Sequence, residues 1–119
     1  MSTRQIGLQG EEQAARLLQH KGYRLIARNF TAAGGEIDLI ALDGKTLVFV
    51  EVKKRASMAF GGPVAAVTPA KRKRISLAAM QYLKANPPKF DSIRFDVVCV
   101  LPGQVEHIMH AFEPERTTL

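Results

Sequence analysis

The chain has 119 residues, the usual length of a single domain, which is enough to bury one hydrophobic core. Hydrophobic residues make up 46% of the sequence and charged residues 24%, which excludes disordered and fibrous proteins. Lys and Arg number 17 against 11 Asp and Glu, so the formal net charge is +6. This excess favours a polyanionic partner, nucleic acid first of all, with a basic surface that has no partner as the alternative.

Two features indicate a cytoplasmic protein. Cys99 is the only cysteine, so no disulfide can form within the chain, and a reducing compartment is expected. The first 12 residues lack the apolar stretch of a secretory signal, and no apolar run is long enough to span a bilayer. We therefore expect no membrane partner.

The first element is a helix over residues 3–21, because apolar residues recur at helical spacing and Gly22 supplies a C-terminal stop. On a helical wheel Glu11 falls within the apolar arc, whereas Glu12 falls on the solvent flank. An acid on an apolar face needs a partner or a function. Glu11 is therefore a candidate site residue.

Three strands are expected after this helix. Residues 23–29 predict the first strand, and residues 31–35 predict a turn-rich loop. Residues 36–43 and 46–54 have the composition of strands on either side of Gly44, which predicts a hairpin.

An irregular segment and a second helix come next. Residues 56–67 contain two glycines and a proline and show no periodicity, which is typical of a functional loop in a small domain. Thr68 followed by Pro69 predicts the N-cap and first residue of a helix. Its apolar face repeats at helical spacing through Leu83, and the residues from Asn86 onward end it.

The last two strands are predicted over residues 93–101 and 105–111, with a proline and a glycine between them. Residues 112–119 are expected to form a loose tail. The order is helix, three strands, helix, two strands, with no internal repeat. The sequence therefore predicts one mixed α/β domain over residues 1–119.

Acidic side chains gather on one face of the predicted hairpin. Strand residues two apart share a face, so Glu36 lies beside Asp38, and Glu51 lies beside Lys53 in the partner strand. If the turn is Gly44 and the residue after it, Asp38 faces Glu51. In that register Glu36 also faces Lys53. If the turn starts one residue earlier, Glu36 faces Glu51 instead.

Such carboxylates repel one another unless they share a proton or a cation. Carboxylate oxygens suit Mg²⁺ or Mn²⁺, so a divalent-metal site is the leading interpretation. The alternative is a cross-strand salt-bridge network around Lys53, which offsets three negative charges with one positive charge.

Four basic residues fill the first turn of the second helix: Lys71, Arg72, Lys73 and Arg74. Cations there oppose the helix dipole, so helix stability does not explain them. Beside the free amide groups of the helix they form a good phosphate site, with a solvated run of charges as the alternative. Lys71 lies on the apolar stripe and is expected to lean toward the sheet.

The C-terminal histidines and the cysteine do not suggest a metal site. His107 and His110 are three apart in a strand and face opposite ways, which predicts surface histidines and no shared zinc ion. Cys99 alternates with apolar residues and is expected in the core.

Two runs in the predicted hairpin resemble the PD-(D/E)XK nuclease motif: Gly34-Gly35-Glu36-Ile37-Asp38-Leu39-Ile40 and Phe49-Val50-Glu51-Val52-Lys53. The chain as a whole is similar to the uncharacterised YraN-like bacterial family within that superfamily. The similarity extends over Gly7-x-x-Gly10-Glu11-x-x-Ala14, Arg28-Asn29-Phe30 and Arg94-Phe95-Asp96-Val97.

The resemblance implies a restriction-endonuclease-like αβββαβ core, a mixed sheet flanked by helices, similar to archaeal Holliday-junction resolvases. It also implies that Asp38 and Glu51 are metal ligands and that Lys53 lies near the attacking water. Glu11 is then expected to approach from the first helix. Gly35-Glu36 stands where the superfamily has a Pro-Asp start, which leaves the role of Glu36 open.

The leading interpretation is a divalent-metal-dependent endonuclease that hydrolyses DNA phosphodiesters, with branched or structured DNA among the candidate substrates. Asp38 and Glu51 are expected to hold Mg²⁺ or Mn²⁺ with the Val52 carbonyl, and Glu11 to assist directly or through water. Lys53 is expected to position or activate the nucleophile. The residues expected to contact nucleic acid, DNA rather than RNA, are Arg55, Lys71, Arg72, Lys73 and Arg74.

Two other functions stay open. One is a non-catalytic nucleic-acid-binding module on the same fold, and the other is a protein-interaction domain that does not contact nucleic acid. The presence of Asp38, Glu51 and Lys53 together favours the enzyme, because a module without catalysis has no reason to keep like charges side by side. A homodimer is also left open.

Overall fold

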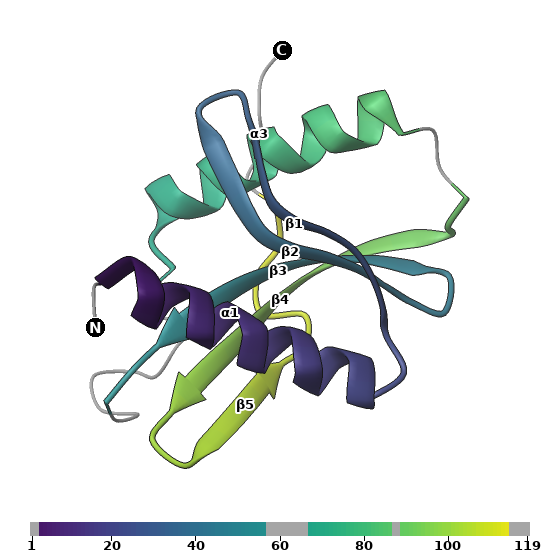
Figure 1. The fold of residues 1–119 in the computed structure, drawn as a ribbon. Helices are drawn as coiled ribbons and strands as arrows, with labels where there is room; N and C mark the ends of the chain where they lie inside the picture. The colour runs from purple at the N-terminus through teal and green to yellow at the C-terminus, as the bar shows by residue number, and fades with distance from the viewer. Residues whose placement is uncertain (1–2, 57–66, 87–88, 115–119) are drawn as a thin grey trace.

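The computed structural model describes residues 3–56, 67–86 and 89–114, and it describes side chains from Gln9 onward. Within these residues the chain forms two helices and five strands (Figure 1). In chain order they are α1 (Thr3–His20), β1 (Arg24–Ala32), β2 (Gly35–Asp43), β3 (Thr46–Lys54), α3 (Pro69–Ala85), β4 (Ser92–Leu101) and β5 (Gln104–Ile108).

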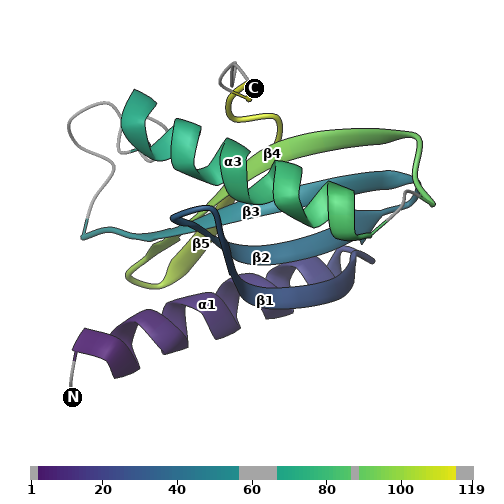
Figure 2. The same ribbon diagram turned by 90° about the horizontal axis from the view of Figure 1, so that it is seen from above.

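The five strands form one sheet in the order β1-β2-β3-β4-β5. β3 and β4 run parallel, and the other neighbouring pairs are antiparallel. A parallel pair needs a crossover connection, and α3 lies in that connection. α3 covers one face of the sheet and α1 the other (Figure 2). This arrangement confirms the predicted mixed α/β class and is compatible with an αβββαβ core.

The hydrophobic core has two layers, because successive strand residues point to opposite faces of the sheet. In the layer under α3, the ring of Phe49 contacts those of Phe95 and Tyr82, with centroids 5.4 and 6.1 Å apart. The layer under α1 joins Leu18 to valines of β3 and β4. Cys99 is fully buried, as predicted.

Both predicted helices are confirmed. α1 ends one residue before the predicted end. α3 begins at Pro69 after the N-cap Thr68, whose side-chain oxygen accepts a hydrogen bond from the backbone amide of Lys71 at 3.3 Å. Its C-cap is Asn86, whose backbone amide donates to the carbonyl of Tyr82. Neither helix that the structure describes is long and apolar enough to cross a membrane.

The prediction of a loop over residues 31–35 is wrong, because β1 and β2 pair as far as Ala32 and Gly35. The connection between them is only Ala33 and Gly34, which have φ angles of 53° and 77°. Two positive φ angles in a two-residue connection match the right-handed twist of the flanking strands. The hairpin is therefore longer and tighter than the glycine-rich sequence suggests.

The C-terminal segment also differs from the prediction. β5 ends at Ile108, and the chain turns at His110, which has a φ of 53°. Phe112 then buries its ring 5.2 Å from that of Phe95, centroid to centroid. The prediction of a loose tail is wrong at Phe112, because this apolar ring completes the layer under α3. The end of that tail, residues 115–119, and most of the predicted loop, residues 57–66, lie outside the described residues.

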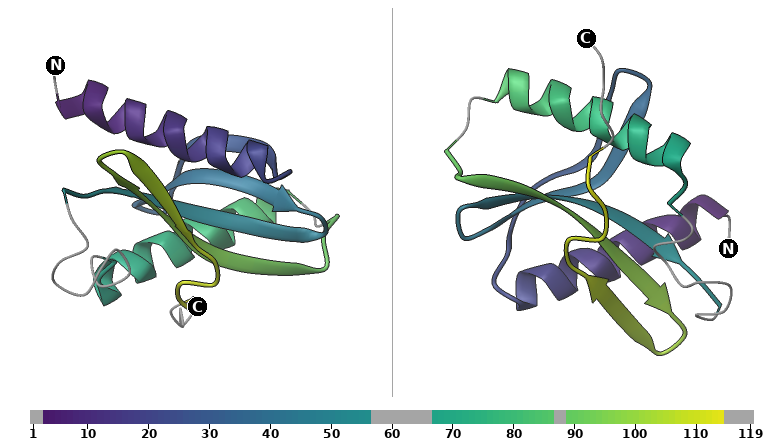
Figure 3. Two further views of the ribbon diagram at one scale, coloured as in Figure 1. Left: turned by 90° about the horizontal axis from the view of Figure 1, so that it is seen from below. Right: turned by 180° about the vertical axis from the view of Figure 1, so that it is seen from behind.

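β2 separates from β3 before either strand ends. Their register stops at Leu39 and Val50, and the β1–β2 hairpin then leans toward α3 (Figures 1 and 3). A Cβ atom on Gly35 would lie 2.1 Å from the carbonyl oxygen of Arg74, so only glycine allows this close approach. Ile37 packs under α3 whereas Leu39 packs under α1. The simple alternation predicted for this strand is therefore wrong at its beginning.

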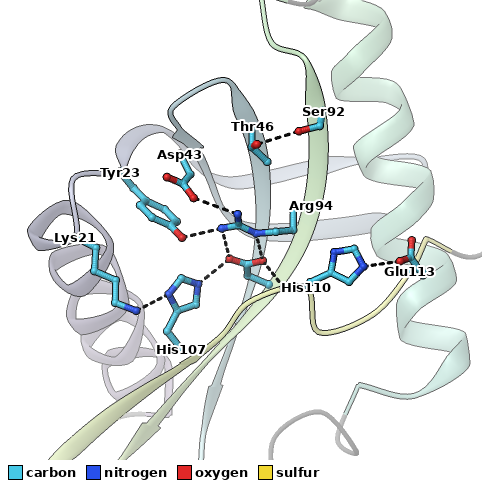
Figure 4. A network of polar contacts seen from close by, with 10 residues as sticks. Lys21, Tyr23, Asp43, Thr46, Ser92, Arg94, His107, His110 and Glu113 are labelled. Carbon is cyan, nitrogen blue, oxygen red and sulfur yellow. Dashed lines mark hydrogen bonds and ion pairs between the residues drawn. The ribbon is translucent and has the colours of Figure 1, made fainter.

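A buried hydrogen-bond network centres on Asp96 of β4, on the face of the sheet that α1 covers (Figure 4). The carboxylate of Asp96 is fully buried and accepts hydrogen bonds from Arg94 at 2.8 and 2.9 Å. It also accepts from the side chain of His107 at 2.7 Å and the backbone amide of His110 at 3.0 Å. Arg94 in turn donates to the hydroxyl of Tyr23 at 2.7 Å. The network therefore joins β4 and β5 to the segment between α1 and β1.

The prediction of a surface position for His107 is wrong, because its side chain is 1% exposed. A lysine ammonium can only donate, so Lys21 donates to Nδ1 of His107 at 2.9 Å, and Nε2 donates to Asp96. Burial raises the pKa of Asp96, but the hydrogen bonds from His107 and Arg94 outweigh burial and leave the pKa below its usual value. His110 is exposed, as predicted.

We expect Asp96→Ala to lower the free energy of unfolding by about 3–5 kcal/mol, because it leaves the buried Arg94 without its main counter-ion. Urea denaturation of the wild type and the variant measures this difference. The control is Asp91→Ala, an exposed aspartate, which should change stability by less than about 0.5 kcal/mol. Equal losses for the two variants would contradict a stabilising role for the network.

Candidate functional site

The candidate site lies where β2 and β3 separate. Asp43 pairs with Thr46 across the turn, and the register runs without a shift to Leu39 and Val50. The next position along this register sets Asp38 opposite Glu51. Of the two predicted turns, the one that starts at Gly44 is therefore confirmed.

The carboxylate of Asp38 takes the place of a strand partner. Because paired register ends at Leu39 and Val50, the backbone amide of Val52 has no partner residue in β2. It donates to Oδ2 of Asp38 at 2.8 Å instead. This hydrogen bond holds the carboxylate of Asp38 over β3.

Glu51 is a buried acid with two cationic neighbours. Its side chain is only 5% exposed, and Oε1 lies 2.8 Å from Nζ of Lys71 and 3.4 Å from Nζ of Lys53. Lys53 follows Glu51 on the same face of β3, whereas Lys71 reaches it from the first turn of α3. The predicted lean of Lys71 toward the sheet is thus confirmed.

The proximity of these charges shifts their protonation. Burial, then the charge of Glu51, raises the pKa of Asp38 to about 7, and a hydrogen bond between the two carboxyl groups contributes. Burial and the neighbouring ammonium of Lys71 lower the pKa of Lys53. Burial also acts to lower the pKa of Lys71, but its contact with Glu51 outweighs burial and raises that pKa.

Asn29 connects the two remaining acids. With its amide nitrogen turned toward the acids, the side chain donates to Glu11 at 3.1 and 3.2 Å and to Glu36 at 3.2 Å. Burial, then the charges of Glu36 and Glu51, raises the pKa of Glu11 against the opposing effect of Asn29. Glu11 thus approaches the acidic cluster from α1, and its charge contributes to the raised pKa of Asp38.

Glu36 does not face Lys53, so that part of the predicted geometry is wrong. β2 has left β3 at this point, and Glu36 pairs with Thr31 of β1. Sequence reasoning also missed the bridging role of Asn29. Its positive φ of 51° is a conformation that asparagine tolerates better than most residues, but no spacing pattern predicts its contacts.

The predicted nucleic-acid-binding residues fall into two groups, the half-buried Lys71 and Arg72 and three exposed residues. Lys73, Arg74 and Arg55 are exposed. Arg72 is half-buried: its Nε donates to the carbonyl of Val67 at 2.9 Å, and its guanidinium lies 5.4 Å from the ring centroid of Phe112. Arg72 therefore stabilises the start of α3, and its contact with nucleic acid stays a prediction.

One cleft borders the site, and a second lies at the end of β3. One of about 600 Å³ lies between the β1–β2 turn and the first turns of α3, and Glu36, Lys71 and Arg74 line it. The other, of about 520 Å³, lies beyond the end of β3 and contains Lys54 and Arg55. Lys71 and Arg74 thus line a cleft beside the acidic pair, and Lys54 and Arg55 line a cleft at the end of the strand that carries Glu51. Within the described residues, no three His, Cys, Asp or Glu side chains come together to hold a metal ion.

We expect stability to depend on pH through Asp38. Its pKa of about 7 in the folded protein exceeds the ordinary value of 3.8, so the folded state binds a proton that the unfolded state releases between these values. The folded state gains stability from holding this proton on Asp38. That gain is fully present below about pH 4 and is lost as the pH rises through 7. Asp38→Asn should remove this dependence, so its stability relative to the wild type should rise by about 1–2 kcal/mol between about pH 5 and pH 8.

Urea denaturation of both proteins across this pH range measures the difference. Asp91→Asn, which changes an exposed aspartate, should follow the wild type. Parallel pH profiles for Asp38→Asn and the wild type would contradict the raised pKa of Asp38.

Comparison with known proteins identifies the family. The model of the "Uncharacterised protein family UPF0102" matches residues 10–100. A UPF0102 protein of Dechloromonas aromatica is 49% identical over 109 residues, which cover 92% of this chain and 89% of the relative. A UPF0102 protein of Syntrophomonas wolfei is 46% identical over 113 residues, covering 92% and 98%. One of Geobacter sulfurreducens is 45% identical over 113 residues, covering 91% and 88%. The predicted resemblance to the YraN-like family is confirmed, and the chain belongs to the uncharacterised protein family UPF0102.

Proposed function

We propose that this protein binds nucleic acid and hydrolyses DNA phosphodiesters with the help of a divalent metal ion. The observation that carries the proposal is the pairing of Asp38 with Glu51 across the separation of β2 and β3. Burial of two carboxylates side by side costs stability, and burial together with the charge of Glu51 raises the pKa of Asp38 to about 7. A cation bound by both carboxylates is the simplest way to offset this cost.

The donor set fits Mg²⁺ or Mn²⁺. Both ions prefer oxygen ligands, and Mg²⁺ commonly uses one or two carboxylates and completes its shell with water and substrate phosphate. Asp38 and Glu51 would be the carboxylate ligands, with the carbonyl of Val52 beside them and Glu11 in reach directly or through water. A bound divalent ion would polarise the phosphodiester and lower the pKa of water.

Lys53 is suited to handle the nucleophile. Its side chain is 18% exposed and lies beside Glu51. Because burial and Lys71 lower the pKa of Lys53, its amine exchanges a proton near neutral pH more readily than an exposed lysine does. Lys53 would orient the attacking water and take part in its deprotonation.

The substrate would lie along the basic surface on both sides of the acidic pair. Lys71, Lys73 and Arg74 would contact phosphates on the α3 side, and Arg55 on the side of β3. The excess of 17 basic over 11 acidic residues supports a polyanionic partner. A cytoplasmic location, with DNA as the partner, belongs to the same proposal.

One observation favours a non-catalytic nucleic-acid-binding module instead. Two ammonium groups, those of Lys71 and Lys53, already neutralise Glu51, and the described residues contain no group of three metal-ligating side chains. Under this alternative the acidic pair belongs to a salt-bridge network. The two functions share a prediction about DNA binding and differ in a prediction about cleavage.

Binding of duplex DNA should weaken steeply with salt, because phosphate contacts release counterions. Replacement of the exposed Lys73 and Arg74 by alanine should reduce the slope of log K against log salt by about two units. Fluorescence anisotropy titrations over a range of salt concentrations measure the slope.

A matched control removes two positive charges at the opposite end of the sheet, with Lys45→Ala and Lys89→Ala, and should leave the slope unchanged. If both double variants flatten the slope equally, α3 is not the binding surface. Absence of binding at low salt would overturn both nucleic-acid functions.

Cleavage should require Glu51. With Mn²⁺ or Mg²⁺ the wild type should cleave at least one of a panel of linear, flapped and four-way DNAs, and Glu51→Gln should reduce the rate by about a hundredfold or more. Gel assays of end-labelled DNA measure the rate.

The control is Glu113→Gln, which makes the same change at a glutamate whose side chain is 75% exposed and should keep full activity. Equal activity of both variants would point to a contaminating nuclease. DNA binding without cleavage of any substrate would leave the non-catalytic module.

A further inference from the structure

We propose that, in the free protein, the ammonium of Lys71 binds the Glu51 oxygen that a metal ion would use. When substrate binds, this ammonium moves to a nucleic-acid phosphate in the adjoining cleft. Divalent metal and nucleic acid would then bind cooperatively, because each removes an obstacle to the other. The inference rests on the proposed function, since it concerns the same acidic pair.

The contact of Lys71 with Glu51 is the closer of the two ion pairs at this acid. Nζ of Lys71 lies 2.8 Å from Oε1 of Glu51, against 3.4 Å for Nζ of Lys53. An ammonium at 2.8 Å from a carboxylate oxygen takes up one of its lone pairs, so it competes with a metal ion for that oxygen. A divalent ion would also repel a cation held so near.

Lys71 can leave Glu51, whereas Lys53 stays beside it. Lys53 shares a strand face with Glu51, so the backbone of β3 keeps the two side chains together. Lys71 comes from α3 on a flexible four-carbon stem, and its side chain is 33% exposed against 18% for Lys53. A change of side-chain rotamer is enough to move its ammonium.

The cleft beside α3 offers Lys71 another anion. Lys71 lines this cleft of about 600 Å³ together with Arg74, so two cations from successive turns of α3 face the same space. The main chain also contributes, since Gly35 brings β2 against the carbonyl of Arg74 and closes one side. A phosphate that enters here meets both cations, and it is the ligand class that such a pair recognises.

Exchange of partners by Lys71 couples the two ligands. Without phosphate, the metal must displace the ammonium from Glu51, which weakens metal binding. With phosphate present, Lys71 has a new counter-ion, and Glu51 becomes available to the metal. Coupling of this kind is reciprocal, so metal should tighten nucleic-acid binding by the same factor.

The experiment measures Mn²⁺ affinity from the electron paramagnetic resonance signal of free Mn²⁺, with and without a short DNA duplex whose integrity is checked on a gel. The wild type should bind Mn²⁺ weakly alone and about tenfold more tightly with DNA. Lys71→Gln, which removes the charge and keeps an aliphatic stem, should bind Mn²⁺ alone about tenfold more tightly than the wild type. DNA should add little to its affinity.

Lys73→Ala is the matched control in the DNA-free titration. It removes one positive charge from the same turn of α3, but Lys73 is exposed. Long-range electrostatics predicts gains for both Lys71→Gln and Lys73→Ala, whereas the proposed exchange predicts a gain for Lys71→Gln alone, together with loss of the effect of DNA. Lys71→Ala is a second test variant, and thermal melts confirm that each protein is folded.

The possible results separate this inference from the proposed function. If Lys71→Gln and Lys71→Ala bind Mn²⁺ no more tightly than the wild type, while the wild type does bind it, the exchange by Lys71 is overturned and the metal site stands. If no protein binds Mn²⁺, with or without DNA, the inference and the metal-dependent function both fail. Loss of binding in Glu51→Gln should accompany a positive result.

Discussion

β2 and β3 stop pairing at Leu39 and Val50, and the acidic pair and its adjoining cleft depend on this early separation. A continuous ladder would satisfy the amide of Val52 with the backbone of β2. Because the ladder stops, the carboxylate of Asp38 accepts that hydrogen bond and is held opposite Glu51. The same separation lets the β1–β2 hairpin reach α3, where Gly35 meets the carbonyl of Arg74. One interruption in a sheet thus produces the acidic pair and the adjoining cleft.

The acidic side chains at the site outnumber the lysines that neutralise them. Glu51 has ammonium partners from β3 and α3, while Asp38 has an amide and a pKa of about 7. Glu11 and Glu36 add negative charge nearby, moderated by the amide of Asn29. A structural salt bridge requires only one acid and one base. Several acids gathered around two lysines exceed this requirement, and the metal ion of the proposed function would supply the missing positive charge.

The hydrogen-bond network around Asp96 has a different role. The buried carboxylate of Asp96 joins Arg94 and His107 to the chain between α1 and β1, so the orientation of α1 depends on it. α1 carries Glu11, and β4 sets the position of β3 through their parallel pairing. A polar network on the other face of the sheet therefore supports the elements that carry the acidic pair.

The sequence by itself determined the element order, the α/β class, the second helix with its Thr68 cap, and the set of acids around the hairpin. These features follow from local periodicity, capping and turn chemistry, which act within a few residues. Only the tertiary structure decided where β2 leaves β3, and hence that Glu36 turns to Asn29 and away from Lys53. It also decided that Phe112 and His107 are buried and that Lys71 contacts Glu51. Contacts between residues distant in sequence depend on sheet twist and on the packing of whole elements, and no local pattern encodes them.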